Sequence, residues 1–456
     1  GIDASMTITI GADLDFGGKS LPYKDVPCTI EGNNHVIKNI KNATPLFGEI
    51  SSAVSNLVID SSCEFTTGAT TAAVFSTSAT ATAKITNITN KADLRVTISA
   101  APEAAHVAAI IAKSAAPISG CVNEGDIMVE YTVDIASNHT LTFGGIAGHT
   151  DGPLTDCTNQ GKITLNASAK IVGGALVGGA AGYANAPLAN CINDGAVSAI
   201  AGSAWIGVSG DGYPPKYVNM TRVTLHVGGV VANTDLAGTF TDCKNTAPIT
   251  YILEDMTRIA NSIGTNRPQC GGVVGARAAD VTNCENSGKI VCQCITPTRG
   301  VQPNTKNYVI IVSGVAGGDQ GTTGAYSQSA TSSNVKNCKT TGNIEVDFDN
   351  QNSYACAAGI CGYPGVESNV SENHIIECTN YGNITVNGVG KMRIGGIAGG
   401  LGHITKCINY GTLTNNLTTT ADDQMGGISG FHSQELDFSG NENYGDVIQT
   451  VAGLKS

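Results

Sequence analysis

Two short motifs alternate along almost the whole chain, and they constrain its fold more than any other feature. One is a glycine-rich pentad such as Gly395–Gly399 (GGIAG), and the other is a C-x-N-x-G segment such as Cys407–Gly411 (CINYG). The pentad recurs, with variations, at 72–76, 108–112, 144–148, 178–182, 228–232, 271–275, 313–317, 358–362, 395–399 and 426–430. The second motif follows at Cys121, Cys157, Cys191, Cys243, Cys284, Cys338, Cys378 and Cys407, and a last copy without cysteine lies at 441–445. Each pair of motifs therefore marks one structural repeat.

The distances between the motifs indicate where a repeat accepts extra residues. In four copies the cysteine follows the last pentad residue by nine positions, as from Gly275 to Cys284. From the second motif to the next pentad the distance varies, from 13 residues after Gly382 to 33 residues after Gly195. We therefore expect one fixed corner in each repeat, with loops inserted mainly at one other corner.

Short runs of alternating apolar and polar residues follow the second motif, for example NITVN at 383–387. A period of two is the pattern of a β-strand with one buried face, and no stretch shows the sustained 3.6-residue period of a helix. Repeats of three short strands predict an all-β fold, a right-handed parallel β-helix (solenoid) of about 10–11 coils. We assign 1–45 to an N-terminal capping segment, 46–445 to the β-helix repeats and 446–456 to a C-terminal tail or cap.

Stacking of successive repeats predicts columns of identical side chains inside the molecule. The cysteines are expected to be buried free thiols, because parallel stacking does not give disulfide geometry. The asparagines of the second motif are expected to form a ladder of amide hydrogen bonds at a tight turn, where asparagine accepts the left-handed backbone. The third pentad residue, as in Ile146 and Ile397, should point inward. The pentad glycines should allow either a positive φ or very close packing.

Composition and charge exclude several classes of function. The net charge of −12 argues against a nucleic-acid partner, which would favour a basic surface. The sequence has no run of 18 apolar residues, so no transmembrane segment is expected. The closest cysteine pairs, Cys292/Cys294 and Cys356/Cys361, have no nearby His or Cys to complete a zinc site, and the histidines are scattered. No cofactor is therefore expected, apart from a possible Ca²⁺ at the acidic strand described below.

The pentads, the N-C-x-N-x-G segments such as 283–288, and the stretch 30–40 with Leu46–Gly48 resemble the GLUG-type repeats of Bacteroidetes surface proteins. The resemblance covers nearly the whole chain. It implies a fold similar to the pectin-lyase-like right-handed β-helices and a role as an adhesin. It also implies a secreted or outer-membrane surface-exposed bacterial protein, with room for a lipid anchor upstream of residue 1. The resemblance carries no catalytic motif.

Insertions provide the candidate binding residues. The long insertion 196–227 contains the only tryptophan of the chain, and a second insertion, 251–269, follows one repeat later. Exposed aromatic rings stack on sugars, and loops on rigid scaffolds often carry function. The predicted ligand-binding residues are Trp205, Tyr213, Tyr217, Arg222, Arg258 and Arg267. The expected partner is a glycan or a host or extracellular-matrix protein. Alternatively, Trp205 and the tyrosines only pin the loop to the scaffold.

The strand EVDFD offers the alternative of an enzyme. Glu345, Asp347 and Asp349 alternate with apolar residues and should share one outer face, where carboxylates could bind Ca²⁺ or act on a polysaccharide. Our first hypothesis is a non-enzymatic surface protein that binds a glycan or host ligand. The second is a polysaccharide lyase or glycoside hydrolase that uses this outer face, and the third is a purely structural spacer.

Overall fold

The computed structural model describes residues 3–100, 102, 104–134, 140–172, 174–204, 225–234, 239–254, 268–277, 280–294, 309–319, 334–363, 374–400, 402–418, 424–431 and 436–450. Throughout these ranges the regular structure consists of β-strands, and no helix occurs. The prediction of an all-β chain is therefore confirmed. Within the same ranges there is accordingly no helical segment that could cross a membrane.

One repeat contains five strand segments rather than the three that the sequence suggested. In the repeat at 140–172 these are β16 (Thr140–Gly144), β17 (Ala147–Thr150), β18 (Leu154–Thr155), β19 (Thr158–Asn159) and β20 (Ile163–Val172). The pentad is the corner between the first two segments, and the cysteine separates the third from the fourth.

Equivalent segments of successive repeats form rows. The row before the pentad corner also contains β7 (Thr71–Ala73), β11 (Ala104–Ala108), β21 (Ala175–Gly178), β26 (Leu225–Gly228), β31 (Gln269–Gly271), β36 (Val309–Ser313) and β48 (Gln424–Gly426). The row after that corner also contains β4 (Phe47–Ile50), β8 (Ser76–Ala79), β12 (Ile111–Ser114), β22 (Ala181–Ala184), β27 (Val231–Thr234), β32 (Val274–Arg277), β37 (Ala316–Asp319) and β41 (Cys361–Tyr363).

The other rows flank the cysteines or follow them. Before the cysteine lie β13 (Ile118–Ser119), β23 (Leu188–Ala189), β28 (Phe240–Thr241), β33 (Val281–Thr282), β38 (Val335–Lys336), β42 (His374–Ile376) and β45 (His403–Thr405). After it lie β14 (Val122–Asn123), β24 (Ile192–Asn193), β29 (Lys244–Asn245), β34 (Glu285–Asn286), β39 (Lys339–Thr340), β43 (Thr379–Asn380), β46 (Ile408–Asn409) and β49 (Glu442–Asn443). In the first repeats β5 (Ala53–Ile59) and β9 (Lys84–Asn90) run through both rows.

The alternating runs form the last row, and three further strands begin the chain. The row comprises β6 (Glu64–Thr67), β10 (Asp93–Ile98), β15 (Ile127–Tyr131), β25 (Val197–Ala204), β30 (Ile249–Leu253), β35 (Ile290–Cys294), β40 (Ile344–Ala358), β44 (Ile384–Gly395), β47 (Leu413–Leu417) and β50 (Val447–Gln449). The N-terminal strands are β1 (Thr7–Thr9), β2 (Leu14–Lys19) and β3 (Thr29–Asn42). Strands β40 and β44 each continue into the row before the pentad corner.

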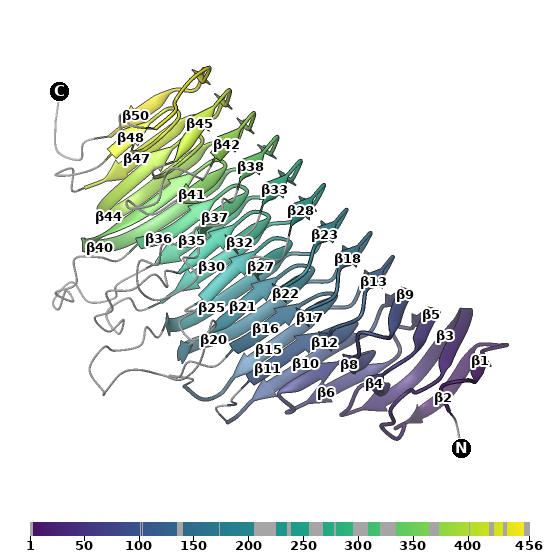
Figure 1. The fold of residues 1–456 in the computed structure, drawn as a ribbon. Helices are drawn as coiled ribbons and strands as arrows, with labels where there is room; N and C mark the ends of the chain where they lie inside the picture. Colours follow the sequence, from purple (N-terminus) through teal and green to yellow (C-terminus); the bar gives the residue numbers. More distant parts are fainter. Residues whose placement is uncertain are drawn as a thin grey trace, which may run out of the picture.

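The strands of each row pair in parallel with strands of the same row in neighbouring repeats, and β1 and β2 pair in parallel with β3. For example, β17 pairs with β12 on one side and with β22 on the other. The row after the pentad corner forms a separate sheet of nine strands, and the other rows are connected in a network of 41 strands. Figure 1 shows the rows stacked along one long axis, with β1 and β2 at one end of the stack and β50 at the other. The long parallel sheets agree with the prediction.

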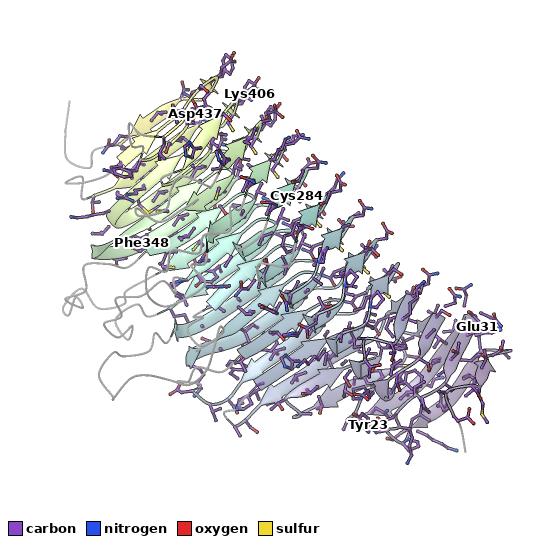
Figure 2. The ribbon with its side chains drawn as sticks, in the orientation of Figure 1. Tyr23, Glu31, Cys284, Phe348, Lys406 and Asp437 are labelled. Atoms are coloured by element: carbon purple, nitrogen blue, oxygen red, sulfur yellow. The ribbon has the colours of Figure 1, made fainter. Side chains whose placement is uncertain are left out.

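The interior columns follow the predicted positions. All fifteen cysteines are unpaired and buried, at most 2% exposed. The inward slot of the pentad is also buried, with Ile146 and Ile397 fully covered. The pentad glycines serve close packing rather than a positive φ, because a Cβ on Gly145 would lie 2.2 Å from Oδ1 of Asn159. Figure 2 shows Cys284 within the stack, about midway along its length.

The asparagine ladder is present and starts one repeat earlier than expected, at Asn90. In each step the Nδ2 of one asparagine donates to the Oδ1 of the next, at 2.7–2.9 Å. The same Nδ2 also donates to a backbone carbonyl two residues further along the chain, as from Asn245 to Ala247. Where Thr340 replaces asparagine, the step from Asn286 lengthens to 3.5 Å.

The left-handed turn lies elsewhere than predicted. The ladder asparagines are in strands, and the positive φ falls on the residue directly before the cysteine of each second motif, with φ between 51° and 64°. These residues are Gly120, Asp156, Asn190, Asp242, Asn283, Asn337, Glu377 and Lys406. The amide of a ladder residue is needed inside, so the turn uses a neighbour whose side chain faces solvent.

Extra residues enter the repeats at two places rather than mainly at one. The longest interval after an alternating run separates β25 from β26, as expected. A second long interval lies after the pentad corner: β37 ends at Asp319, and β38 begins only at Val335. The spacing of nine residues holds in four copies only. It is 21 residues from Gly317 to Cys338 and 16 from Gly362 to Cys378, so the sequence already contained the signal for this second position.

Candidate functional site

The six residues predicted to bind a ligand lie outside the described part of the structure. They are Trp205, Tyr213, Tyr217, Arg222, Arg258 and Arg267. Their role therefore stays a prediction, and the described surface provides the geometry for a candidate site.

The acidic strand has the alternation that the sequence predicted. Val346 and Phe348 of β40 are buried in the core at 0% and 1% exposure. Glu345, Asp347 and Asp349 lie on the other face of the strand and are half-buried. Three carboxylates therefore share one outer face.

The partners of these carboxylates come from the adjacent strands. The Nζ of Lys289 lies 2.7 Å from Oε2 of Glu345. Asp347 accepts two hydrogen bonds, from Nε2 of Gln293 at 3.1 Å and from Nδ2 of Asn387 at 3.0 Å. These contacts run along the row of strands, so they support strand pairing. Among the described residues, no group of three or more His, Cys, Asp and Glu side chains is arranged to hold a metal ion.

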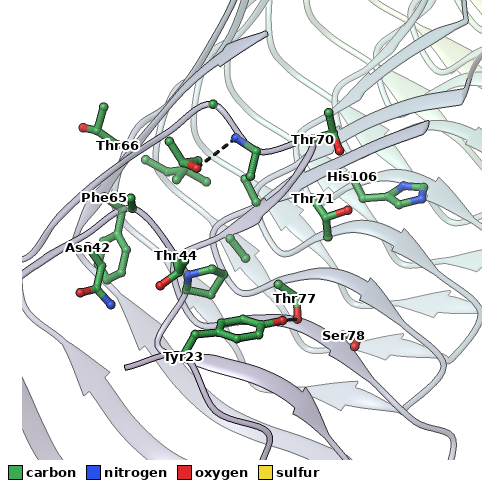
Figure 3. A pocket seen from close by; sticks show the side chains of 18 of the residues that line it. Tyr23, Asn42, Thr44, Phe65, Thr66, Thr70, Thr71, Thr77, Ser78 and His106 are labelled. Atoms are coloured by element: carbon green, nitrogen blue, oxygen red, sulfur yellow. Dashed lines mark hydrogen bonds between the residues drawn. The ribbon is translucent and has the colours of Figure 1, made fainter. Parts of the chain in front are cut away.

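A pocket of about 810 Å³ lies near the N-terminal end of the stack. Such a volume is typical of small-molecule sites, which span roughly 300–1,000 Å³. We call it the Thr-lined pocket; its lining residues are Tyr23, 42–45, 65–73, Thr77, Ser78, Leu94, His106 and Lys113. In Figure 3, Tyr23 and Thr77 lie on one side of the pocket and Thr66 and Thr70 lie across from them. The lining comes from at least four separate segments of the chain.

Asn42, at the end of β3, contributes a buried amide to the pocket. Its side chain is 5% exposed, and its Oδ1 accepts hydrogen bonds from the Oγ of Ser20 and the backbone N–H of Leu21, both at 2.9 Å. These two bonds fix the orientation of the amide. Its Nδ2 has no hydrogen-bond partner. That nitrogen is itself buried, so it is an unsatisfied donor within the pocket wall and is not open to a ligand.

Tyr23 and Phe65 supply the aromatic surface of the pocket. The hydroxyl of Tyr23 lies 2.9 Å from Oγ1 of Thr77, and the tyrosine is 44% exposed. Phe65 of β6 is almost fully buried and forms part of the wall. Exposed aromatic rings held by a hydrogen bond are suited to stacking against the apolar face of a sugar.

His106 and Lys113 lie on the side of the pocket that faces the following repeats. The Nδ1 of His106 is 2.8 Å from Oγ1 of Thr142 in β16. Burial, with smaller contributions from the nearby His149 and Lys113, lowers the pKa of His106 to about 4. His106 is therefore neutral near pH 7, and the exposed Lys113 is the charged residue among the described lining residues.

From His106, a row of rings continues along the stack. The ring centroids of His106 and His149 are 5.5 Å apart, and those of His149 and Tyr183 are 4.9 Å apart. The Nε2 of His149 lies 3.2 Å from Oδ1 of Asp151, whereas its buried Nδ1 has no partner. Burial lowers the pKa of His149 despite that carboxylate. The row positions titratable groups beside the Thr-lined pocket.

A second aromatic feature occupies the other end of the stack. Tyr381, Tyr410 and Tyr444 are exposed and stack in parallel, with centroids 4.9 and 5.1 Å apart and interplanar angles of 8° and 10°. Each tyrosine follows a ladder asparagine, so the repeated tripeptide N-Y-G was a visible signal. Stacked rings cover one another's faces and present mainly their edges, so this tyrosine row is less suited to sugar stacking than the isolated ring of Tyr23.

Sequence reasoning missed the Thr-lined pocket. Its residues are spread from Tyr23 to Lys113, and only the run TTGATT at 66–71 hints at a hydroxyl-rich surface. Comparison with known proteins adds no assignment: no protein-family model matches the chain, and no curated protein is significantly similar to it.

Proposed function

We propose that this chain is a right-handed parallel β-helix of about 10–11 coils that acts as a non-enzymatic glycan-binding protein. The strictly parallel pairing of each strand with its own row supports the β-helix. The expected hand follows from the crossover rule for parallel strands. In this proposal the stack is a rigid scaffold, and its outer surface carries the binding residues.

The observation that carries the glycan proposal is the composition of the Thr-lined pocket. Six threonines and one serine offer hydroxyls, and Tyr23 offers a ring. Sugars are recognised by this combination of hydrogen-bonding groups and an aromatic surface. The predicted loop residues, with Trp205 foremost, would extend the contact surface.

A secreted or outer-membrane surface location in a bacterium is part of the same proposal. It rests on the resemblance to GLUG-type surface repeats, which also suggests adhesion to a host glycan or matrix protein. The buried state of all fifteen thiols is compatible with an extracellular location, because burial limits their reaction with oxidants.

The two alternatives are less well supported by the geometry. A polysaccharide lyase or hydrolase at the outer face of β40 would need free carboxylates, but Glu345 binds Lys289 and Asp347 accepts two hydrogen bonds. A weak Ca²⁺ contact at this strand would compete with the same partners. A purely structural spacer would have no use for a pocket lined by an exposed tyrosine and several threonine hydroxyls.

A binding screen tests the proposal. The protein would be applied to an array of glycans and matrix proteins, with and without Ca²⁺, beside the variant Ala43→Trp. Ala43 is an exposed lining residue, so the larger side chain should fill the pocket without disturbing the core. We expect glycan binding by the native protein that the variant loses. Absence of any glycan bound by the native protein, or cleavage of a polysaccharide during incubation, would contradict the proposal.

A further inference from the structure

A pair of histidine rings joins the two sheets of the stack beside the Thr-lined pocket. His106 lies in β11, within the row before the pentad corner, and His149 lies in β17, within the separate sheet after that corner. Their ring centroids are 5.5 Å apart, and His149 is only 8% exposed. The Nδ1 of His106 lies 2.8 Å from Oγ1 of Thr142. The contact between the sheets therefore includes two titratable side chains.

His149 has no acceptor for a second proton. Its Nε2 lies 3.2 Å from Oδ1 of Asp151, whereas its Nδ1 is buried and has no hydrogen-bond partner. A protonated imidazole carries an N–H donor on both nitrogens. Protonation of His149 in place would leave one of these donors buried and unsatisfied, which costs free energy. Protonation of His106 as well would put two positive rings in contact.

The surrounding strands supply few charges to stabilise protonated rings. β7 and β16, which flank β11 in its own row, carry no ionisable side chain. On the other sheet, β12 brings the cation Lys113, and Asp151 follows His149 directly after β17. Tyr183 of β22 stacks beside His149, and Glu49 of β4 lies two strands from Lys113 in the same column. Among the described residues, Asp151 is the only carboxylate bonded to this ring pair.

The titration of the two rings has the direction that this environment requires. Burial lowers the pKa of His106 to about 4, and burial also lowers the pKa of His149. A segment that has opened takes up protons near the ordinary value of 6.5. The packed form is therefore fully favoured above about pH 6.5 and loses stability relative to the opened form as the pH falls toward 4.

We propose that His106 and His149 form an acid-sensitive clamp between the two sheets, closed near neutral pH and released in mild acid. On release each ring takes up a proton and leaves the contact, so β11, β12, β16 and β17 open while distant repeats stay packed. Opening can be local because each repeat of such an array contacts only its neighbours. His106 and Lys113 line the Thr-lined pocket, so its wall opens with them. The clamp does not depend on what the pocket binds.

Hydrogen exchange of the full chain tests the clamp segment by segment. Peptide mass spectrometry at about pH 7 and about pH 5 measures opening after correction for the intrinsic exchange rate. We expect exchange in the four strands to rise about twentyfold at the lower pH, the ratio that one histidine with a pKa of about 4 when packed and 6.5 when open gives. His374 and His403 provide an internal control, because their rings stack at 4.6 Å within a single row. Peptides around them should show no comparable rise.

Substitutions identify the groups that respond. Glutamine cannot take up a proton in this range, so His106→Gln and His149→Gln should each reduce the rise, and the double variant should abolish it. Lys113→Gln removes a positive charge near His106 and should reduce the rise only in part. Lys162→Gln, an exposed lysine outside the pocket lining, is the control and should leave the rise unchanged. Thermal unfolding near neutral pH shows whether each variant is folded.

Several results would overturn the clamp. One is an equal rise in the double variant and the native protein. A second is a rise spread evenly along the stack, including the peptides of His374 and His403, since that would be global unfolding. A third is exchange that does not change between the two pH values. If the double variant does not fold, the single variants decide, and an undiminished rise in both contradicts the proposal.

Discussion

Two columns of the stack have the same parallel register, but one keeps nearly the same residue in every repeat and the other varies from repeat to repeat. The column of ladder residues from Asn90 to Asn443 is nearly uniform, with one threonine among the asparagines. The column through the middle of the row before the pentad corner is chemically mixed. In register, it runs Thr71, His106, Thr142, Leu176, His226, Gln269, Ile311, Cys356, Arg393 and Gln424.

The difference follows from what each column contacts. A ladder asparagine contacts its own kind above and below, and each amide requires a complementary amide, so a change in one repeat leaves two neighbours unsatisfied. The mixed column lies outside the main core, where Leu176 and Ile311 belong to small separate clusters. A change there affects local packing only. The mixed column can therefore carry function, and it contributes Thr71 and His106 to the Thr-lined pocket.

A charge buried in a uniform column should cause the largest loss of stability. Cys284 lies in the buried cysteine column, where its N–H contacts Sγ of Cys338 at 3.4 Å. Cys284→Asp would place a carboxylate there without a cationic partner, and we expect a loss of about 3–5 kcal/mol in the free energy of unfolding. Chemical denaturation with hydrogen exchange measures it, and Cys284→Ala is the control for lost volume. An equal loss in both variants would refute the buried-charge explanation.

Removing one amide from the ladder should have the next largest effect. Asn245 accepts from Asn193 and donates to Asn286 and to the carbonyl of Ala247. Asn245→Leu leaves these groups unsatisfied, so we expect a loss of about 2–4 kcal/mol. The exposed Asn443 at the end of the ladder is the matched control. Asn443→Leu should cost clearly less by denaturation, and equal costs would mean that the ladder bonds are not cooperative.

The mixed column should respond to pH through His106. Because the pKa of His106 is about 4 in the folded chain and ordinarily 6.5, the unfolded chain takes up the proton first as pH falls. Stability is therefore lost between about pH 6.5 and pH 4, by about 2–3 kcal/mol from this group. Denaturation at about pH 7 and about pH 4.5 measures the change. His106→Gln should lose less stability over this interval than the native protein; identical losses would exclude His106 as the cause.

The outer face of β40 should tolerate change best. Asp347→Asn keeps the shape and alters only two partly exposed hydrogen bonds, with Gln293 and Asn387. We expect a destabilisation below about 1 kcal/mol and no change in glycan binding. Thermal unfolding and the array measure both. A large loss of binding or of a polysaccharide-cleaving activity would move the functional site to this strand and favour the enzyme alternative.

The fold was largely predictable because its signal is repeated. The cysteine and asparagine columns, the inward pentad residue and the all-β character were read from the spacing of two motifs. The division of each repeat into five strand segments and the left-handed residue before each cysteine were not. Sequence patterns report which side chains are buried, whereas strand ends and turn positions depend on the backbone path around each corner.

The candidate site was not predictable, because its residues do not recur from repeat to repeat. The Thr-lined pocket depends on residues that occur once, such as Tyr23, Asn42 and Lys113, and no motif connects them. The unusual aromatic and basic content of 196–227 drew attention to Trp205, which lies outside the described residues. A sequence pattern reveals features that recur in every repeat. It does not reveal a contact that forms only once, because such a contact depends on distances across the fold.

The amino-acid sequence by itself determined the repeat length, the buried columns and the parallel stacking, since equivalent residues must satisfy one another in every repeat. The tertiary structure alone decided that the buried Nδ2 of Asn42 is left without a partner and that Asp347 is engaged by its neighbours. Both facts depend on which side chains of distant segments come within about 3 Å of each other, the range of a hydrogen bond. Local periodicity carries no information about contacts of that kind.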